Sequence, residues 1–185
     1  YSGMVIENVQ PGPSPSWLID RLTAIGLRSV NNIVDITNFV LMEYGQPLHA
    51  FDRESLEKST IVVRRAVKDE AFISLDGSNL KLDEDALIIA DANKPVALAG
   101  IMGGANSQVT EFTRHIVLES ASFDPTTVRK GSKKYGLRSD SSIRFERGID
   151  IEGVIAAQAR AALLIQKLAG GTIRRGRVDV YPSPL

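Results

Sequence analysis

Two side chains stand out as groups that could do chemistry: the imidazole of His49 and the carboxylate of Glu119. An imidazole exchanges protons near neutral pH, and a carboxylate that ends an apolar stretch needs a partner if it is buried. Three glycines within positions 100–104 add backbone amides that can approach a ligand closely. With Thr37, Asn38 and Ser139, this set could position water against a reactive ester, the glycine amides serving as an oxyanion hole. It could equally line a pocket that only binds.

The composition excludes several other chemistries. There is no cysteine, so thiolate nucleophiles, disulfides and cysteine zinc sites are absent. The glycine cluster lacks the Gly-Lys-Ser/Thr of a phosphate loop and the spacing of a dinucleotide fingerprint. Lys and Arg total 22 against 22 Asp and Glu, which argues against a strongly electrostatic nucleic-acid binder, although residues 129–147 are locally basic. No apolar run approaches the roughly 20 residues of a membrane span, so we expect no membrane segment. Residues that could bind a metal are not clustered in the sequence, so we expect no metal site either.

The polar groups must be positioned by a helix and a corner that the sequence predicts at 31–52. Gly45 ends the predicted helix, and Pro47 stiffens the corner that leads to His49. Small polar residues are disfavoured inside helices because they compete for backbone hydrogen bonds. The predicted helix contains several of them, which favours the interpretation that it forms the wall of a site. The apolar stripe comprises Ile33, Ile36, Val40 and Leu41, and the polar positions are Asn31, Asn32, Asp35, Thr37 and Asn38.

Elsewhere the pattern is typical of a mixed α+β fold, in which short strands alternate with amphipathic helices. In 115–120, Ile116 and Leu118 are expected to face one side of a strand, and Glu119 the other. Trp17 is expected to anchor the core. Further helices are predicted at 16–25, 125–135 and 154–168, and strands at 5–9, 60–66, 71–75, 87–91, 96–99 and 172–180.

The length of 185 residues suits one large domain, 1–185, or two small and closely packed subdomains within it. The start at Tyr1 and the Pro-rich stretch at 182–185 suggest a piece of a longer protein.

Five motifs, taken in order, resemble the editing module of the phenylalanyl-tRNA synthetase beta subunit. They are NNIVDITNFV, GQPLHAFD, ALAGIMGG, LESASFDP and GLRSDSSIRFERGID, and the similarity runs over about residues 15–170. The resemblance implies a three-layer ββα sandwich of short-stranded sheets and helices, within a longer subunit of a cytoplasmic (αβ)2 enzyme. It implies the alpha subunit and the tRNA for phenylalanine as partners. ATP and magnesium would serve the parent ligase, with no cofactor in this chain.

The same resemblance implies an aminoacyl-tRNA deacylase activity, which removes tyrosine wrongly esterified to the tRNA for phenylalanine. His49 would be the catalytic base or an orienting group, and Glu119 would accept the hydrogen bond of the tyrosine phenol. Many relatives carry Ala where this chain has Ser141, so its hydroxyl is expected to narrow or polarise the pocket. The implied substrate-binding residues are Thr37, Asn38, Pro47, Ala50, Gly100, Gly103, Ser139, Asp140 and Ser141.

Two other hypotheses stay open on the residues alone. A non-catalytic tRNA- or partner-binding module is favoured by the basic segment between Lys130 and Arg147 and by Ser141. A purely structural spacer within the subunit is the third. Tyrosine binding in the pocket would exclude the spacer, and tRNA binding without deacylation would favour the binding module.

Overall fold

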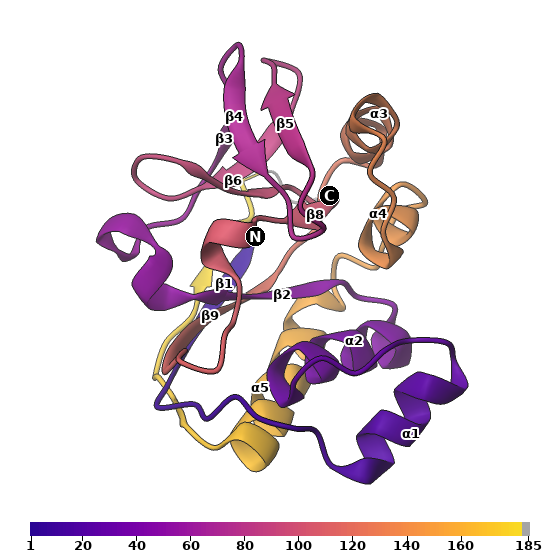
Figure 1. Cartoon of the computed structure of the whole chain (residues 1–185), viewed down its shortest axis with the longest axis vertical. Coiled ribbons are helices and arrows are strands. Elements are labelled where there is room, and N and C mark those ends of the chain that lie inside the picture. Colours follow the sequence, from indigo (N-terminus) through magenta and orange to yellow (C-terminus); the bar gives the residue numbers. More distant parts are fainter. Residues whose placement is uncertain (183–185) are drawn as a thin grey trace. The chain divides into compact units, whose positions relative to one another are not determined.

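A computed structural model describes residues 1–182 of the chain (Figure 1). The Pro-rich end expected to mark a longer protein falls largely at 183–185, outside the described residues. The chain divides into two units, each assembled from separate segments. Unit 1 comprises Tyr1–Asp52, Val109–Ala121 and Asp150–Leu185, and unit 2 comprises Arg53–Gln108 and Ser122–Ile149.

Unit 1 contains one antiparallel sheet of short strands in the order β10-β1-β9-β2, with β11 also paired to β1. The central strand β9 alternates as predicted, since Ile116 and Leu118 are fully buried while Val117 is half-buried. This alternation leaves one face of the sheet for the core and the other for Val117 and Glu119. The bounds are β1 Ser2–Glu7, β2 Leu48–Asp52, β9 His115–Ser120, β10 Thr172–Ile173 and β11 Val178–Asp179.

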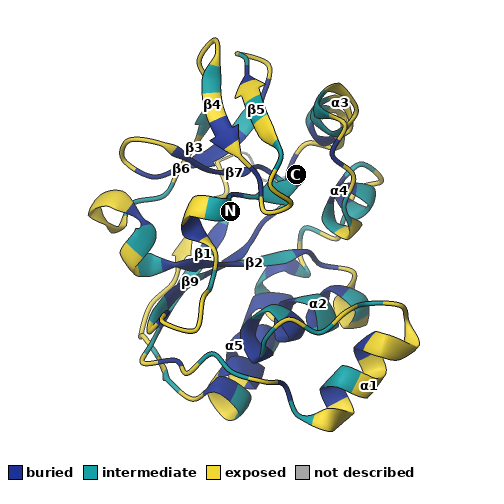
Figure 2. Cartoon of the chain, in the orientation of Figure 1, coloured by how far each residue is buried: buried dark blue, intermediate teal, exposed yellow. Residues whose placement is uncertain are grey.

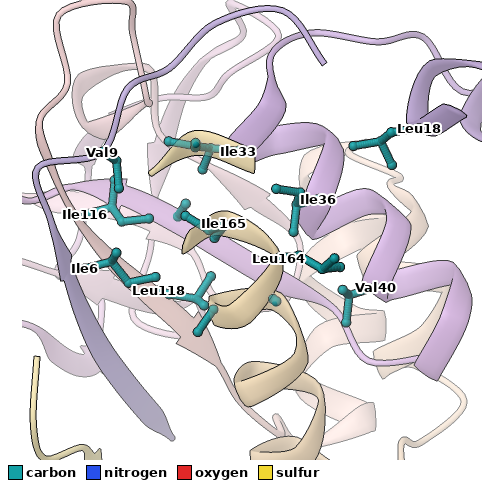
Figure 3. Packing of buried hydrophobic residues seen from close by; sticks show 14 of the residues in the cluster. Ile6, Val9, Leu18, Ile33, Ile36, Val40, Ile116, Leu118, Leu164 and Ile165 are labelled. Atoms are coloured by element: carbon teal, nitrogen blue, oxygen red, sulfur yellow. The ribbon is translucent and has the colours of Figure 1, made fainter. Parts of the chain in front are cut away.

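Helices α2 and α5 enclose the hydrophobic core of unit 1 against this sheet (Figure 3). Figure 2 shows their buried faces in dark blue. Ile33, Ile36 and Val40 of α2 pack with Ile165 of α5 and Leu118 of β9. Burying such a side chain stabilises the fold by about 1.5–3 kcal/mol, so the sheet that carries His49 and Glu119 is held firmly. The helices are α1 Ser16–Ala24, α2 Asn32–Tyr44 and α5 Val154–Ala169.

The polar residues of α2 mainly hold the fold together. Asn31 caps the helix, accepting hydrogen bonds from the backbone N–H groups of its first turn at 3.1 and 2.9 Å. Asn32 donates to the carbonyls of Gln10 (3.1 Å) and Leu168 (3.3 Å), which fastens the N-terminal loop and the end of α5 to the helix. These two side chains therefore have structural hydrogen bonds within the fold, and the polar site wall stays a prediction.

Asp35 of α2 is fully buried and accepts three hydrogen bonds. Its Oδ2 accepts from the hydroxyls of Ser14 (2.6 Å) and Ser29 (2.5 Å), and its Oδ1 accepts from the N–H of Val30 (2.8 Å). A buried carboxylate is tolerated only where donors replace its lost water. Asp35 therefore fixes the loops on both sides of α1 to α2.

Unit 2 contains a four-stranded antiparallel sheet in the order β3-β6-β7-β8, a separate β4-β5 hairpin, and two helices. Asp124 caps α3 by accepting from the N–H of Thr127 at 2.7 Å, and Gly136 ends that helix in the left-handed conformation with φ 67°. The elements are β3 Val62–Arg65, β4 Glu70–Ile73, β5 Asn79–Leu82, β6 Leu87–Ala90, β7 Pro95–Leu98, β8 Met102–Gly103, α3 Pro125–Tyr135 and α4 Asp140–Phe145, with short 3-10 turns at Arg53–Ser55, Glu57–Ser59 and Ala105–Ser107.

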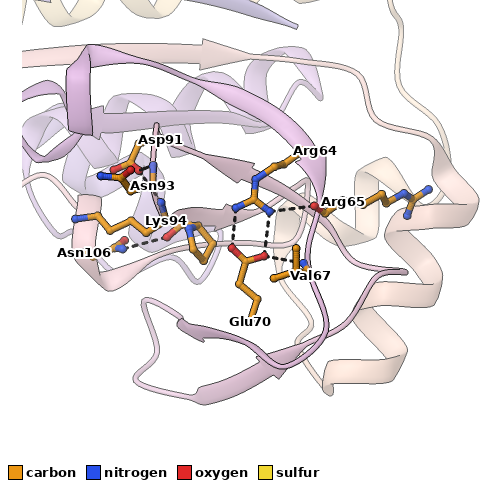
Figure 4. A network of polar contacts seen from close by, with 9 residues as sticks. Arg64, Arg65, Val67, Glu70, Asp91, Asn93, Lys94 and Asn106 are labelled. Atoms are coloured by element: carbon orange, nitrogen blue, oxygen red, sulfur yellow. Dashed lines mark hydrogen bonds and ion pairs between the residues drawn. The ribbon is translucent and has the colours of Figure 1, made fainter.

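Polar contacts pin two turns of unit 2 (Figure 4). Both terminal nitrogens of Arg64 donate to Glu70, at 3.0 and 2.7 Å, and the N–H of Val67 donates to the same carboxylate at 2.8 Å. The Arg64 hydrogen bond holds the pKa of Glu70 below its usual range. Asp91 accepts from the backbone N–H groups of the following turn, each at 2.8 Å. These carboxylates close the turns between β3 and β4 and between β6 and β7.

The α+β fold class is confirmed, but three local predictions are wrong. Trp17 is 38% exposed, because it lies at the surface of α1 against the edge of Phe39 with Arg21 over its ring at 5.5 Å. The strand predicted at 172–180 is broken into β10 and β11, which pair with different parts of β1. The corner before Asp52 was not predicted to be a strand, yet residues 48–52 form β2 by pairing with β9.

Candidate functional site

The two residues chosen for their chemistry, His49 and Glu119, lie opposite each other on neighbouring strands. β2 pairs with β9 in a register that places His49 against Glu119. Directly opposed residues of an antiparallel pair project from the same face, with Cβ atoms about 4.5–5.5 Å apart. The next pair, Ala50 and Leu118, belongs to the hydrophobic core. His49 and Glu119 therefore share the sheet face that points away from the core.

His49 has a buried ring nitrogen without a hydrogen-bond partner. Its ring packs edge-on against Phe51 at 4.4 Å, and among residues 1–182 its Nε2 is the one fully buried side-chain nitrogen or oxygen that makes no hydrogen bond. Burial lowers the pKa of His49 from 6.5 to about 4. The residue as a whole keeps some exposed surface, but the pKa follows the covered nitrogen, where the charge would form. An unsatisfied buried group costs about 1–3 kcal/mol, so a ligand hydrogen bond here would be favourable.

Glu119 is only 7% exposed, and its Oε2 accepts a hydrogen bond from the phenol of Tyr1 at 2.8 Å. Burial raises the pKa of Glu119 from 4.5 to about 7, against the lowering effect of the Tyr1 hydrogen bond and the chain's terminal ammonium group. Burial, and then the Glu119 charge, raise the pKa of Tyr1 well above its ordinary value, so the phenol stays a donor. Near neutral pH the pair thus consists of a neutral imidazole and a half-ionised carboxyl.

The other predicted residues of unit 1 differ in what they can offer a ligand. Thr37 is nearly buried, and its hydroxyl donates to a carbonyl of its own helix at 2.7 Å. Asn38 is half-buried on α2, and Pro47 is buried at the start of the corner. Ala50 faces the hydrophobic core rather than the His49 face of the sheet. The structure therefore brings His49 and Glu119 together and gives Ala50 a packing role.

In unit 2, the predicted Gly100 lies in the tight turn between β7 and β8, with φ +70°. A Cβ at this position would lie 3.0 Å from side-chain atoms of Phe123 and Val128 and 3.1 Å from Phe145. Both the backbone conformation and the packing therefore require glycine. Gly103 is a residue of strand β8, where it pairs with a residue of β7.

Ser139 of the last motif caps α4 through a reciprocal capping box with Ser142, at 3.1 and 2.9 Å. Its hydroxyl also donates to the carbonyl of Ile101 at 2.6 Å, which ties α4 to the turn that contains the glycines. Asp140 is exposed and pairs with an arginine one turn later at 3.1 Å, and Ser141 is half-buried. Within unit 2 the structure therefore joins Ser139 to the glycine turn.

Gly104 was counted in the glycine cluster without a structural role, and Tyr1 was not singled out from the sequence. Gly104 is required by close packing, because a Cβ there would lie 2.6 Å from the carbonyl oxygen of Val96. Tyr1 contacts Glu119 across 118 positions of sequence, and no local pattern could have revealed that contact.

A cavity of about 490 Å³ in unit 2 is lined by none of the predicted site residues. Its walls mix the cations of Arg65, Lys130 and Lys134 with the carboxylates of Glu84 and Asp85. Lys134 also forms an ion pair with Asp85 at 3.7 Å, so part of this charge is neutralised within the cavity. The chemistry of the chain is therefore better represented by the His49–Glu119 pair than by this cavity.

Two other kinds of feature are absent from residues 1–182. No helix in this range combines the length and apolar character needed to cross a membrane. No group of three or more His, Asp or Glu residues in the same range is arranged to hold a metal ion.

Comparison with known proteins places the chain in a class. The B3/4 domain family matches residues 1–170, and the chain belongs to this family. More particularly, it is similar to phenylalanine–tRNA ligase beta subunits. It is 54% identical over 185 residues to that of Geobacter sulfurreducens, 53% over 185 residues to that of Syntrophus aciditrophicus, and 53% over 184 residues to that of Salinibacter ruber.

These alignments cover the whole chain but only 22–23% of each beta subunit. The resemblance based on five motifs is confirmed, and it extends over nearly all of the sequence.

Proposed function

We propose that the chain is a hydrolytic editing domain that removes tyrosine wrongly esterified to the tRNA for phenylalanine. The observation that carries the proposal is the pairing of His49 with Glu119 on one face of the unit 1 sheet, in a chain of the B3/4 family. The imidazole nitrogen of His49 that makes no hydrogen bond and the buried carboxylate of Glu119 are both groups that can form a hydrogen bond with a ligand hydroxyl.

Glu119 is assigned the recognition of the tyrosine phenol. Tyrosine and phenylalanine differ only by that hydroxyl, and a site built to hydrogen-bond it rejects the analogue that lacks it by up to about 10⁴–10⁵-fold. The discrimination arises because the carboxylate oxygen that would accept from the phenol lacks a donor beside a phenyl ring. The low exposure of Glu119 supports this role, since little of the carboxylate can be hydrated in place of the missing partner.

His49 is assigned an orienting role in the hydrolysis. The ester is already activated, so a positioned water suffices and no strong nucleophile is required. With a pKa of about 4, His49 is neutral at pH 7 and a weak base, whereas an efficient general base has a pKa close to the working pH. The role assigned to it is to hold the water or the ester through Nε2, which makes no hydrogen bond within the described residues. Gly100, Gly103, Ser139, Asp140 and Ser141 stay predictions of the family resemblance.

The proposal extends to the setting of the chain. We propose that it works in the cytoplasm within a phenylalanine–tRNA ligase, with the alpha subunit in an (αβ)2 assembly and with the tRNA for phenylalanine. ATP and magnesium would serve the synthetic reaction of that ligase, and the hydrolysis assigned to this chain requires neither. Deacylation in the presence of a chelator and without ATP tests this last point.

The decisive experiment is deacylation of tyrosyl-tRNA for phenylalanine by the complete ligase containing this chain. Glu119→Ala is expected to slow hydrolysis by about 10- to 100-fold, the worth of a hydrogen bond to a charged group. His49→Ala is expected to slow it about tenfold if the imidazole orients, and by 10²–10⁴-fold if it is a general base. His115→Ala and the exposed Glu111→Gln serve as matched controls, and phenylalanine charging reports on the fold.

Loss of tyrosine deacylation with intact phenylalanine charging would support the proposal. Unchanged hydrolysis in both site variants would place the editing pocket elsewhere and end the assignments of His49 and Glu119. Binding of tRNA by the wild-type ligase without any deacylation would favour the non-catalytic binding module instead.

A further inference from the structure

The two oxygens of the Glu119 carboxylate differ, because one accepts a hydrogen bond and the other does not. Oε2 accepts the phenol hydrogen bond of Tyr1 at 2.8 Å. Oε1 makes no hydrogen bond within residues 1–182, yet it is not among the fully buried unpartnered atoms of that range and so keeps accessible surface. One oxygen is therefore fixed by the protein, and the other is free for a ligand donor.

The surroundings of Glu119 on the sheet leave room for the Tyr1 ring. On β1, the residue opposite Glu119 is Gly3, which has no side chain. A Cβ at Gly3 would lie 3.9 Å from Cε1 of Tyr1, so the aromatic ring covers the place where a side chain would stand. On β2, the residue opposite Glu119 is His49. Glu119 thus stands between a tyrosine ring on one side and an imidazole on the other.

We propose that Tyr1 is a positioning residue, which fixes the Glu119 carboxylate through Oε2 so that Oε1 meets the phenol of the bound amino acid. The inference rests on the proposed function, in which Glu119 recognises that phenol. A carboxylate held in place before the ligand arrives loses less freedom on binding, which strengthens recognition. Tyr1 acts through Glu119 and does not itself touch the ester.

The Tyr1 hydrogen bond also favours the ionised carboxylate, which can only accept. Its loss would raise the pKa of Glu119 further, since this bond now lowers it. The other titratable side chain that faces Glu119 within unit 1 is His49 on β2, which is neutral at pH 6 and above. Removal of the phenol should therefore harm tyrosine recognition more at pH 6 than at pH 8.

The test is tyrosine deacylation by the complete ligase that contains this chain, with Tyr1→Phe, which removes only the hydroxyl. We expect KM for tyrosyl-tRNA to rise about tenfold at pH 8 and further at pH 6, with kcat changed less. Tyr44→Phe, at an exposed tyrosine of unit 1, is the matched control and should behave as wild type. Phenylalanine charging by the same preparations shows that the fold is intact.

Wild-type deacylation by Tyr1→Phe at both pH values would overturn the inference. So would a loss of equal size at pH 6 and pH 8 with KM unchanged, because a merely structural hydroxyl gives that result. Glu119→Gln, assayed in parallel, separates the two proposals. If Glu119→Gln loses deacylation and Tyr1→Phe does not, only the role of Tyr1 is wrong. If neither loses it, the recognition role of Glu119 fails as well.

Discussion

The pKa values of His49 and Glu119 are shifted in opposite directions. Between pH 5 and pH 7 we therefore expect their two contributions to the pH dependence of the unfolding free energy to cancel. Burial raises the pKa of Glu119 from 4.5 to about 7 and lowers that of His49 from 6.5 to about 4. Folding therefore favours the protonated carboxyl and the neutral imidazole. Burial is the main cause of both shifts, and His49 is not among the charges that shift the pKa of Glu119, so a substitution that keeps the volume at one position is expected to leave the other residue's shift in place.

The two groups act on stability with opposite signs. Glu119 has the higher pKa in the folded chain, so its stabilising contribution is complete below pH 4.5 and is lost as the pH rises through 7. His49 has the lower pKa in the folded chain, so its contribution is complete above pH 6.5 and is lost as the pH falls through 4. From pH 5 to pH 7, each changes the free energy of unfolding by about 2 kcal/mol, one downward and one upward.

Urea unfolding of the chain at pH 5 and pH 7 measures this directly. The pair should contribute almost no pH dependence in the wild type. His49→Gln should lose about 2 kcal/mol of unfolding free energy on going from pH 5 to pH 7, because only the Glu119 effect remains. Glu119→Gln should gain about 2 kcal/mol over the same interval.

Other carboxylates do not confuse the comparison. Glu70 and Asp91 have lowered pKa values in the folded chain, so they titrate below pH 5 and cancel between variants. The exposed Glu111→Gln should follow the wild type. If both site variants kept the wild-type difference between the two pH values, the burial argument for His49 and Glu119 would be refuted.

Three further substitutions probe the supporting structure by the same unfolding measurement. Asp35→Asn should cost about 2–4 kcal/mol, because it replaces a charged acceptor of three hydrogen bonds, while the exposed Asp20→Asn should cost less than about 0.5 kcal/mol. A cost below about 1 kcal/mol for Asp35→Asn would contradict its role as a buried acceptor. Gly100→Ala should cost about 2–4 kcal/mol from its positive φ and the 3.0 Å contacts, whereas Gly12→Ala, which meets no atom within 4 Å, should be nearly neutral. Ser139→Ala should lower the free energy of unfolding by about 1 kcal/mol through the lost helix cap. An unchanged urea midpoint would show that the cap does not stabilise the fold.

Features that depend on neighbours along the chain were predictable from the sequence. The ends of α2 at Gly45 and of α3 at Asp124 and Gly136 agree with the prediction, because such caps lie within a turn of the ends they define. Asn31 was counted among the polar residues of the helix, but it is the cap of α2. The alternation of β9 placed Glu119 on the correct face. The family resemblance rested on five short motifs, each of which is made of residues that are neighbours along the chain.

Features that depend on distant partners were missed. Residues 48–52 follow a glycine and a proline and looked like a corner, but pairing with β9 makes them a strand. The polar residues of α2 suggested a site wall, although Asn32 and Asp35 bond to loops whose positions the sequence does not reveal. The contact between Tyr1 and Glu119 spans 118 positions. Each of these outcomes was decided by tertiary structure rather than by local propensity.

The segmented construction of the units dictates an order of events during synthesis. The central strand β9 follows the whole of 53–108 in the chain, so β1 and β2 leave the ribosome long before the strand that must lie between them. The β4-β5 and β6-β7 pairings are local and can close early, whereas pairings of large sequence separation form slowly. A nascent chain that has reached Gln108 holds hairpins of unit 2 but no assembled sheet in unit 1. His49 and Glu119 therefore meet only after the intervening residues 53–108 have been made, and until then the edges of β1 and β2 are exposed to mispairing.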